Sequence, residues 1–412
     1  MKKTLVTIGI ILNVIFFSIP LCRAQESAAR PAKYVVLAWN DLGMHCYNMD
    51  YQDLAVLPPY NTIWAQVFKV GEPPQIVVKG IIVEYSFKDN TYSAGIPGKP
   101  DKTNFWKYVK QLFGKDFAPN TGLAGKGLSG SMDAKEDHFE AVGIPLTEYR
   151  DQDALQGIDK KDWNRYPYQL CEVVVKDAQS GAELCRATIV APVSSELNCA
   201  TCHSDSGKAT AQSGIVPQGR TGANIIATHD AANAGKYSPP LASRRPVLCA
   251  ECHSSNAIGT KGKKGLPSLS NAIHDRHKFI SAQYPGTAGC YSCHPGNRTQ
   301  CLRDTMAGNY NLNCTSCHGD ILAVSKNKQP WLSEPRCNTC HGSGYAPDKP
   351  LYKHSKGSTG IYCAGCHDSP HAIAPSREHN DQIKFLAWQG RPGTLRDCAL
   401  CHGAMPKERF TH

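Results

Sequence analysis

Hydrophobic and polar positions follow two different patterns along the chain. Between residues 25 and 194, runs rich in β-branched and aromatic side chains alternate in part with polar ones, which is typical of strands. From residue 195 to residue 412, long apolar periodicities are few, and Gly, Pro, Ser and Asn are frequent. We therefore predict a mixed fold: a β-rich, sandwich-like domain (25–194, the β region) and then a mostly helical and irregular one (195–412, the motif region).

Several strands can be placed in the β region. Strand-like segments occupy residues 33–40 (KYVVLAWN), 61–70 (NTIWAQVFKV) and 75–88 (QIVVKGIIVEYSFK). Residues 168–193 predict a hairpin, with its turn at residues 177–181.

One helix is predicted in the same region, over the stretch NFWKYVKQLFGKDF that begins at Asn104. Thr103 or Asn104 is the expected N-cap, because a short polar side chain can accept a hydrogen bond from the first turn. The side chains expected on the buried face are Phe105, Val109, Leu112 and Phe113.

The first 24 residues have the pattern of an export signal. Two lysines precede an almost uncharged apolar run, residues 5–21, and small residues stand at the −3 and −1 positions of a cleavage point after Ala24. In an alternative, Cys22 is lipidated, but Leu21 stands where a small residue is wanted. A retained anchor would be short for a bilayer. We expect export to the periplasm or to the outer cell surface.

The cysteines change this picture. The chain has 19 cysteines, of which 14 form seven Cys-x-x-Cys pairs, each followed at once by a histidine. The pairs, numbered here as motifs one to seven, are Cys199/Cys202, Cys249/Cys252, Cys290/Cys293, Cys314/Cys317, Cys337/Cys340, Cys363/Cys366 and Cys398/Cys401. The motif histidines are His203, His253, His294, His318, His341, His367 and His402.

Covalent haem explains why a histidine follows every pair. Two thiols add to the two vinyl groups of one porphyrin edge, and the next residue then lies beneath the ring, where its imidazole reaches the iron. A zinc ribbon or a redox dithiol does not require a histidine at that place in every copy. The motifs therefore predict seven covalently bound haems c.

Nine histidines lie outside the motifs and could supply sixth ligands to the irons. They are His45, His138, His229, His274, His277, His354, His371, His379 and His412. If every iron binds two histidines, seven of these nine are needed.

The spacing of four of them is informative. His371 follows the motif histidine His367 by four residues, too few to pass around the porphyrin rim, so we expect it to ligate a neighbouring haem. His274 and His277 are spaced i, i+3 and would project from one helix face toward two different haems. His229, between the first two motifs, is a further candidate ligand.

Other candidates are less constrained. His354 precedes the sixth motif by nine residues and could ligate a haem, and His45 could reach one from the β region or from a neighbouring subunit. Met306 could ligate in place of a histidine or pack against a porphyrin. His138, in the polar stretch KEDHFEA, is expected to face solvent.

Four cysteines of the mature chain remain outside the motifs, and they allow three pairings. Cys171 and Cys185 flank the predicted hairpin turn, so a bridge there is sterically reasonable. Cys46 and Cys301 would then connect the β region to the motif region. The alternative is free thiols, which are uncommon in exported proteins.

Several stretches are similar to those of bacterial exported multihaem c-type cytochromes. They are AWNDLGMHCYNMDYQDLAVLPPYNT, FEAVGIPLT, APVSSELNCATCH, CYSCHPGNRTQCLRDTM and CHDSPHAI. The resemblance covers most of the mature chain and implies respiratory electron transfer at or beyond the cell envelope. As ligands it favours His229, His274, His277 and His371.

The resemblance also directs attention to His45 and Met306, and it has one visible departure. Members of the group tend to carry a histidine in a Gly-His-Gly-Gly-like stretch before the sixth motif, where this chain reads GSTG. His354 would have to replace that histidine as a ligand.

The charge of the chain fits a haem protein better than a nucleic-acid-binding one. The formal charge is +10 and falls to +7 without the three basic residues of the signal. Basic residues are scattered rather than gathered in a patch with aromatic side chains, so no nucleic-acid footprint is predicted. The propionates of seven haems would offset this positive charge.

These features predict an electron carrier that exchanges electrons with redox partner proteins or extracellular acceptors through a row of haems. Two alternatives stay open. One is a multihaem oxidoreductase acting on nitrite, hydroxylamine or a sulfur oxyanion, which needs an iron with an open face. The other is a subunit of a haem filament. In the mature chain no segment is long and apolar enough to predict a membrane span.

Overall fold

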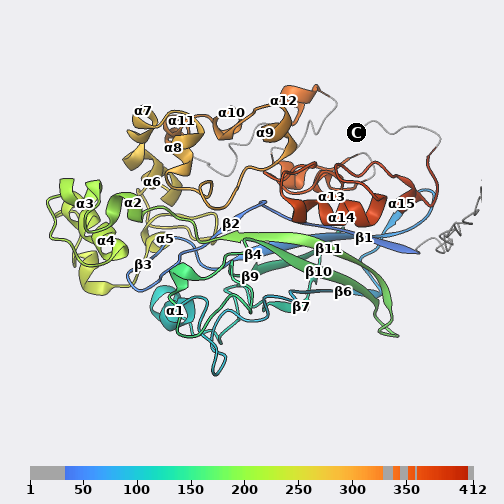
Figure 1. Ribbon diagram of the computed structural model, residues 1–412, viewed down its shortest axis with the longest axis horizontal. Coiled ribbons are helices and arrows are strands. Elements are labelled where there is room, and N and C mark those ends of the chain that lie inside the picture. The colour runs from blue at the N-terminus through green and yellow to red at the C-terminus, as the bar shows by residue number, and fades with distance from the viewer. Residues whose placement is uncertain (1–32, 328–336, 344–350, 358–359, 407–412) are drawn as a thin grey trace, which may run out of the picture. The chain divides into compact units, whose positions relative to one another are not determined.

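The strands and helices are distributed unevenly along the chain. The computed structural model describes residues 33–327, 337–343, 351–357 and 360–406 (Figure 1). In this part of the chain the strands lie before residue 195, except for β12 (Val247–Leu248), and helices α2 to α15 lie after it. The predicted mixed fold class is confirmed. The predicted export signal lies outside the described residues.

The first sheet is built on two long antiparallel strands. Strand β1 pairs with β4 along its whole length, from Tyr34 opposite Lys69 to Asn40 opposite Ile63. Both strands are buried on both faces, which explains their almost continuous apolar sequences. The strands of this sheet are β1 (Tyr34–Asn40), β4 (Asn61–Lys69), β9 (Phe139–Ile144), β8 (Asp133–Ala134) and β5 (Gln75–Ile76).

The second sheet contains the predicted hairpin. Strands β10 and β11 are antiparallel, and β10 alternates between buried and outward side chains, with Cys171, Val173 and Val175 buried. Strand β2 adds to the edge in parallel, with His45 opposite Val193. The strands of this sheet are β2 (His45–Cys46), β11 (Glu183–Ser194), β10 (Tyr168–Asp177), β6 (Ile81–Ser86) and β7 (Ser129–Ser131).

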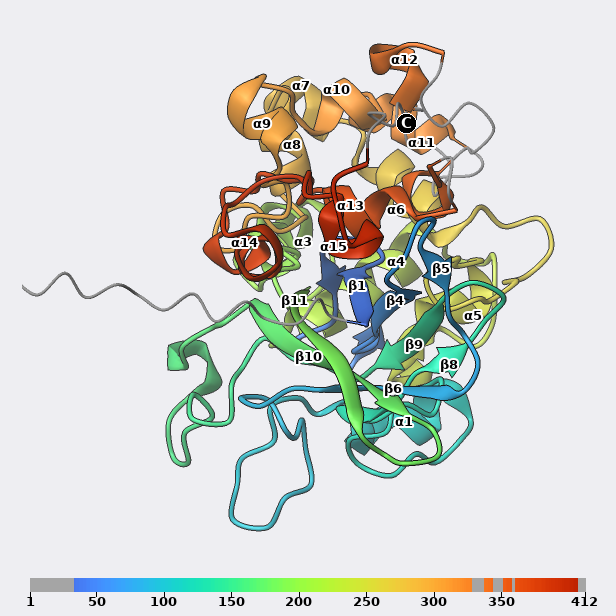
Figure 2. The same ribbon diagram turned by 90° about the vertical axis from the view of Figure 1, so that its right-hand side faces the viewer.

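The two sheets share one hydrophobic core. Val36, Ile63 and Val67 of the first sheet belong to the same buried cluster as Val173 and Ile189 of the second. Side chains on the other face of β1 and β4 form a separate cluster with side chains of the motif region, as described below. Figure 2 shows the β10–β11 hairpin together with β6.

The predicted elements of the β region are confirmed with one correction. Helix α1 spans Phe105–Phe113, and it ends at Gly114, whose left-handed conformation stops the helix. The predicted strand at 75–88 is wrong as a single element. It is divided into β5 and β6 around Gly80, whose φ of 72° breaks the extended chain.

Short helices alternate with irregular segments in the motif region, as predicted, and each motif contributes to one helix. The motif helices are α2 (Ala200–His203), α5 (Cys249–Cys252), α8 (Thr287–Tyr291), α10 (Cys314–His318), α12 (Cys337–His341), α13 (Cys363–His367) and α15 (Ala399–His402). The other helices are α3 (Lys208–Gln212), α4 (Thr221–Ala232), α6 (Leu269–His277), α7 (Ile280–Gln283), α9 (Thr305–Asn309), α11 (Ile321–Lys326) and α14 (His379–Gln389). No helix among the described residues could span a membrane.

The motif region packs directly on the β region. Helices α13 and α15 contact β1, and α14 contacts β11 (Figure 1). Val35, Leu37 and Trp39 of β1 belong to one buried cluster with Tyr362 and Cys401. A parallel bridge between β12 and β3 (Leu54–Ala55) adds a second junction. Residues Lys33–His412 accordingly form one compact unit.

Two buried ion pairs of the motif region lie at this junction. The Arg303 guanidinium donates two hydrogen bonds, of 2.7 and 3.1 Å, to the Asp381 carboxylate, and both side chains are almost fully buried. The Lys384 ammonium lies 2.8 Å from the Asp368 carboxylate and donates to the Ala38 carbonyl of β1 at 3.1 Å. Because removing one partner leaves a buried charge unpaired, these pairs fix how the segments fit together.

Candidate haem-binding site

Residues of motifs one to six line one continuous cavity. Its volume is about 4690 Å³, several times the 300–1,000 Å³ typical of a pocket for one small molecule. The motif cysteines among its lining residues come from motifs one to six: Cys199, Cys202, Cys249, Cys252, Cys290, Cys293, Cys314, Cys317, Cys340 and Cys363. The cavity is therefore large enough for several cofactors lined up near one another.

Histidines face each other across this cavity in pairs. The ring centroids of His203 and His277 are 6.2 Å apart, those of His274 and His294 are 6.0 Å apart, and those of His318 and His371 are 6.0 Å apart. Two imidazoles on opposite faces of one iron place their centroids about 6 Å apart, because each metal–nitrogen bond is about 2 Å long. The spacing of the three pairs therefore fits an iron between the rings.

Each pair joins one motif histidine to one histidine outside the motifs. His274 and His277 extend from helix α6 toward two different motif histidines, as their spacing predicted. His371 lies opposite His318 of motif four, so the prediction that it faces a neighbouring motif agrees with the geometry. His229 is near His253 of motif two, whose charge adds to burial in lowering the pKa of His229.

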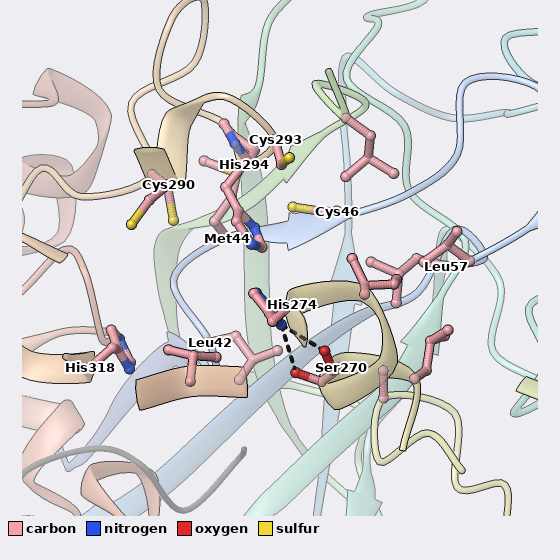
Figure 3. Close-up of a pocket in the computed structure, with 18 of the residues that line it drawn as sticks. Leu42, Met44, Cys46, Leu57, Ser270, His274, Cys290, Cys293, His294 and His318 are labelled. Atoms are coloured by element: carbon pink, nitrogen blue, oxygen red, sulfur yellow. Dashed lines mark hydrogen bonds between the residues drawn. The ribbon is translucent and has the colours of Figure 1, made fainter. Parts of the chain in front are cut away.

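The Nδ1 atoms of four of these histidines donate to backbone carbonyls. His253, His274, His277 and His371 each donate from Nδ1 to a backbone carbonyl, at 2.7 to 3.2 Å. Figure 3 shows His274 with its two contacts to Ser270. A carbonyl can accept but not donate, so Nδ1 carries the proton and the Nε2 lone pair is available to a metal.

Burial also keeps the paired imidazoles neutral. Burial, followed by the charges of His274 and His318, lowers the pKa of His294 to about 4. Burial, followed by the charge of His318, lowers the pKa of His371 to about 4. A histidine must be neutral to bind a metal, so both are ready to act as ligands at neutral pH.

The β region supplies contacts to one of these ligands that the sequence did not reveal. The Leu42 carbonyl accepts the Nδ1 hydrogen of His371 at 3.2 Å. Gly43 packs so tightly that an added Cβ would lie 1.6 Å from the Pro370 carbonyl oxygen. Arg303 donates from its backbone to the His371 carbonyl at 2.8 Å and from its side chain to the Gly43 carbonyl at 2.8 Å.

The seventh motif has a different neighbourhood. The Glu72 carboxylate accepts a hydrogen bond from Nδ1 of His402 at 2.9 Å, and the Gly71 N–H donates to the Cys401 carbonyl at 3.1 Å. Both residues belong to the turn between β4 and β5. Sequence patterns could not identify Glu72, because it is 330 residues from His402.

Three other predicted ligands, His45, His354 and Met306, also line the cavity. His45 is buried and lines the cavity, but its Nε2 lies 2.8 Å from the Asp41 carboxylate. His354 lines the cavity, with its ring 5.8 Å from that of Trp64. Met306 also lines the cavity. The roles of His45, His354 and Met306 stay predictions.

Two further histidines, His379 and His138, lie among the described residues. His379 is the first residue of helix α14, and His412 lies outside the described residues. The expectation that His138 faces solvent is wrong, because it is 9% exposed and stacks on Trp64 at 4.5 Å. The stacking explains the error, since a polar sequence around His138 conceals its aromatic partner.

The proposed bridge between Cys171 and Cys185 is wrong. Cys171 is opposite Ile189 in the hairpin and Cys185 is opposite Val175. The two cysteines are therefore four residues apart along the strands, about 13 Å, whereas a disulfide needs Cα atoms within about 7 Å. Cys46 and Cys301 both line the cavity, and both are free thiols in the structure, so the predicted bridge between them is not present there.

Comparison of the chain with protein-family models, with curated proteins and with solved structures finds no match. Within the described part of the chain, no group of three or more His, Cys, Asp or Glu side chains could hold a metal ion. The histidines come instead in twos, with Cys-x-x-Cys thiols beside them. This donor set fits haem, which brings its own equatorial nitrogens and needs two axial ligands from the protein.

Proposed function

We propose that the protein is a heptahaem c-type cytochrome that carries electrons between redox partner proteins or to an extracellular acceptor. The observation that carries the proposal is the set of three imidazole pairs 6.0 to 6.2 Å apart, each including a motif histidine. Haem would supply the one-electron chemistry of its iron. The protein's own residues would hold and orient each haem and shield it from solvent.

The chain's own side chains have three tasks in this proposal. The motif cysteines would attach each haem through thioether bonds, and the motif histidine would be one ligand of its iron. A histidine from elsewhere in the chain would be the second ligand. The backbone carbonyls that receive Nδ1 hold each ring in one tautomer and one orientation.

Contacts between the motif helices support an order of the haems that differs from their order in sequence. The first two motifs are linked through helix α4, where Asn224 donates to the His203 carbonyl at 3.0 Å and His229 faces motif two. Motifs one and three are linked through helix α6, which carries both His277 and His274. The proposed order therefore begins with motif two, followed by motif one and then motif three.

The same reasoning extends the order. The backbone of Asn198, just before motif one, donates to the Cys293 carbonyl of motif three at 3.1 Å. Helices α8 and α10 of motifs three and four contact each other. His371, the partner of His318 in motif four, follows the sixth motif by four residues, and Leu395 donates to the Cys366 carbonyl at 3.0 Å on the way to motif seven. For the six motifs that these contacts connect, the order we propose is motif two, one, three, four, six and seven.

In this proposal the domains keep their predicted limits, with residues 25–194 as the haem-free domain and 195–412 as the heptahaem domain. The first covers and orients haem ligands through Leu42 and Gly43, so it is more than a shield. The filament version in which His45 ligates a haem of a neighbouring subunit is disfavoured, since His45 is 7% exposed and bound to Asp41.

The proposal is tested first on the purified exported protein. Denatured mass should include seven haems, dithionite should produce the α band of ferrous low-spin haem, and the oxidised spectrum should be almost wholly low-spin. A mass without haem would contradict the proposal. A high-spin fraction in the unaltered protein would instead favour the oxidoreductase alternative, which needs an iron with an open face.

The proposed pairing is tested by single substitutions. His274→Gly and His277→Gly should each make one haem of seven high-spin, and the double variant should make two high-spin, because the two ligands serve different irons. Exogenous imidazole should restore the low-spin spectrum. If both single variants affected the same haem, the assignment of helix α6 to two haems would be wrong.

A further inference from the structure

The seventh motif is held by the turn between β4 and β5 of the β region. In addition to the contacts of Gly71 and Glu72, a Cβ added to Gly403, just after the motif, would lie 3.4 Å from a methyl of Val70. The turn therefore follows the chain from Cys401 to Gly403. It brings a carboxylate to the outward nitrogen of the motif histidine, with Glu72 Oε2 2.9 Å from His402 Nδ1.

This Nδ1 partner differs in charge from the Nδ1 partners found at motifs one to four. The paired histidines His253, His274, His277 and His371 donate to neutral carbonyls, and His229 donates to the hydroxyl of Tyr237. Nδ1 of His203 is buried without a partner in the described structure. Among the eight histidines assigned to motifs one to four, none has a carboxylate at Nδ1 in the described structure.

We propose that Glu72 sets the reduction potential of the seventh haem and makes that haem more reducing than the haems of motifs one to four. The inference rests on the proposed function, because it needs a haem bound by Cys398, Cys401 and His402. A carboxylate that accepts the Nδ1 hydrogen makes the imidazole a stronger donor to the iron. Stronger donation and nearby negative charge both stabilise the ferric form, so the potential falls.

The geometry indicates that the hydrogen bond from His402 to Glu72 lowers the reduction potential more than the charge of Glu72 does through space. The Glu72 side chain is 64% exposed, so water weakens its effect through space. The His402 side chain is 8% exposed, so the donated hydrogen lies at a mostly buried ring. The effect of Glu72 is therefore local to one haem.

The position of motif seven gives this tuning a use. Among the six motifs so ordered it stands at one end, next to motif six, and Cys398, Cys401 and His402 are not among the residues that line the shared cavity. A reducing haem at the end of a row resists accepting electrons from the others and readily gives its own away. Glu72 thereby distinguishes one end of the row from the other.

The experiment is a spectroscopic redox titration of the intact exported protein and of Glu72→Gln. The amide cannot accept as a charged carboxylate does, so the reduction equilibrium of one haem should shift by about tenfold toward the ferrous form, about 59 mV for one electron. The other six haems and the low-spin spectrum should be unchanged. Glu136→Gln, at an exposed carboxylate of the β region, removes the same charge and should shift nothing.

A variant that lacks the seventh haem identifies which haem responds to Glu72→Gln. In a Cys398→Ser/Cys401→Ser variant, six haems should remain, a low-potential step should be missing, and Glu72→Gln should have no further effect. If Glu72→Gln left every potential unchanged in a protein with seven haems, the inference would fail while the proposed function stood. If the protein held no haem at all, the proposed function would fail first.

Discussion

The interiors of the β region and of the motif region are filled in different ways. In the β region, side chains of two sheets fill the interior, with Val36, Ile63 and Val173 almost fully buried in one cluster. In the motif region, the largest feature is a cavity of about 4690 Å³. Within the described structure, every hydrophobic cluster includes side chains of the β region, and none lies wholly in the motif region.

This difference indicates what each region depends on in order to fold. The β region can bury its own apolar surface, which is the main favourable contribution to folding. The motif region has too few apolar side chains for that, so we infer that porphyrin rings supply its interior. The positions of its helices then depend on bonds to haem rather than on side-chain packing.

Preventing haem attachment should produce the largest difference in stability between the two regions. When the protein is produced without haem attachment, amide hydrogen exchange should become fast throughout the motif region while β10 and β11 stay protected, because the sheets have their own core. The measurement is residue-resolved exchange of the haem-free and haem-loaded forms. Equal loss of protection in both regions would show that the β region also depends on haem.

The contact between Gly43 and the loop before His371 is the next most sensitive place. Gly43→Ala puts a Cβ 1.6 Å from the Pro370 carbonyl oxygen, so the loop must move and take His371 with it. We expect one haem of seven to become high-spin, and added imidazole to restore the low-spin spectrum. Absorption and electron paramagnetic resonance spectra would measure both.

A matched control separates this displacement from backbone strain. Gly80 has a φ of 72°, close to the 75° of Gly43, but a Cβ there would meet no atom within 4 Å. Gly80→Ala should cost about 1–2 kcal/mol of stability and leave all haems low-spin. A high-spin signal in Gly80→Ala, or none in Gly43→Ala, would contradict the role of Gly43 in positioning His371.

The sequence predicted contacts that are local and missed those that are distant. The i, i+3 spacing of His274 and His277 predicted that both project from one helix, because a helix fixes the relative directions of side chains three residues apart. Periodicity likewise predicted β1, β4 and the β10–β11 hairpin. Leu42 and Glu72 could not be predicted, because they meet His371 and His402 across 329 and 330 residues.

A substitution inside the β core should affect stability and leave the haems unchanged. Ile63 is fully buried between the two sheets, so Ile63→Ala should lower the free energy of unfolding of the β region by about 2–5 kcal/mol. Denaturant unfolding followed by tryptophan fluorescence and by the haem bands would measure the two regions separately. Ile82→Ala, at a side chain 40% exposed on β6, should cost much less.

The smallest expected effect comes from a neutral partner of a haem ligand. The Tyr237 hydroxyl donates to the Asp230 carboxylate at 2.6 Å, so its oxygen accepts from Nδ1 of His229 at 2.8 Å. Tyr237→Phe removes both bonds, should cost about 0.5–1.5 kcal/mol of stability for each bond, and should raise the potential of the second haem. The shift should be smaller than that of Glu72→Gln, because the lost acceptor carries no formal charge. Tyr310→Phe, at a ring 72% exposed, is the control. A shift as large as that of Glu72→Gln would mean that the charge of the acceptor does not distinguish the two ends of the row.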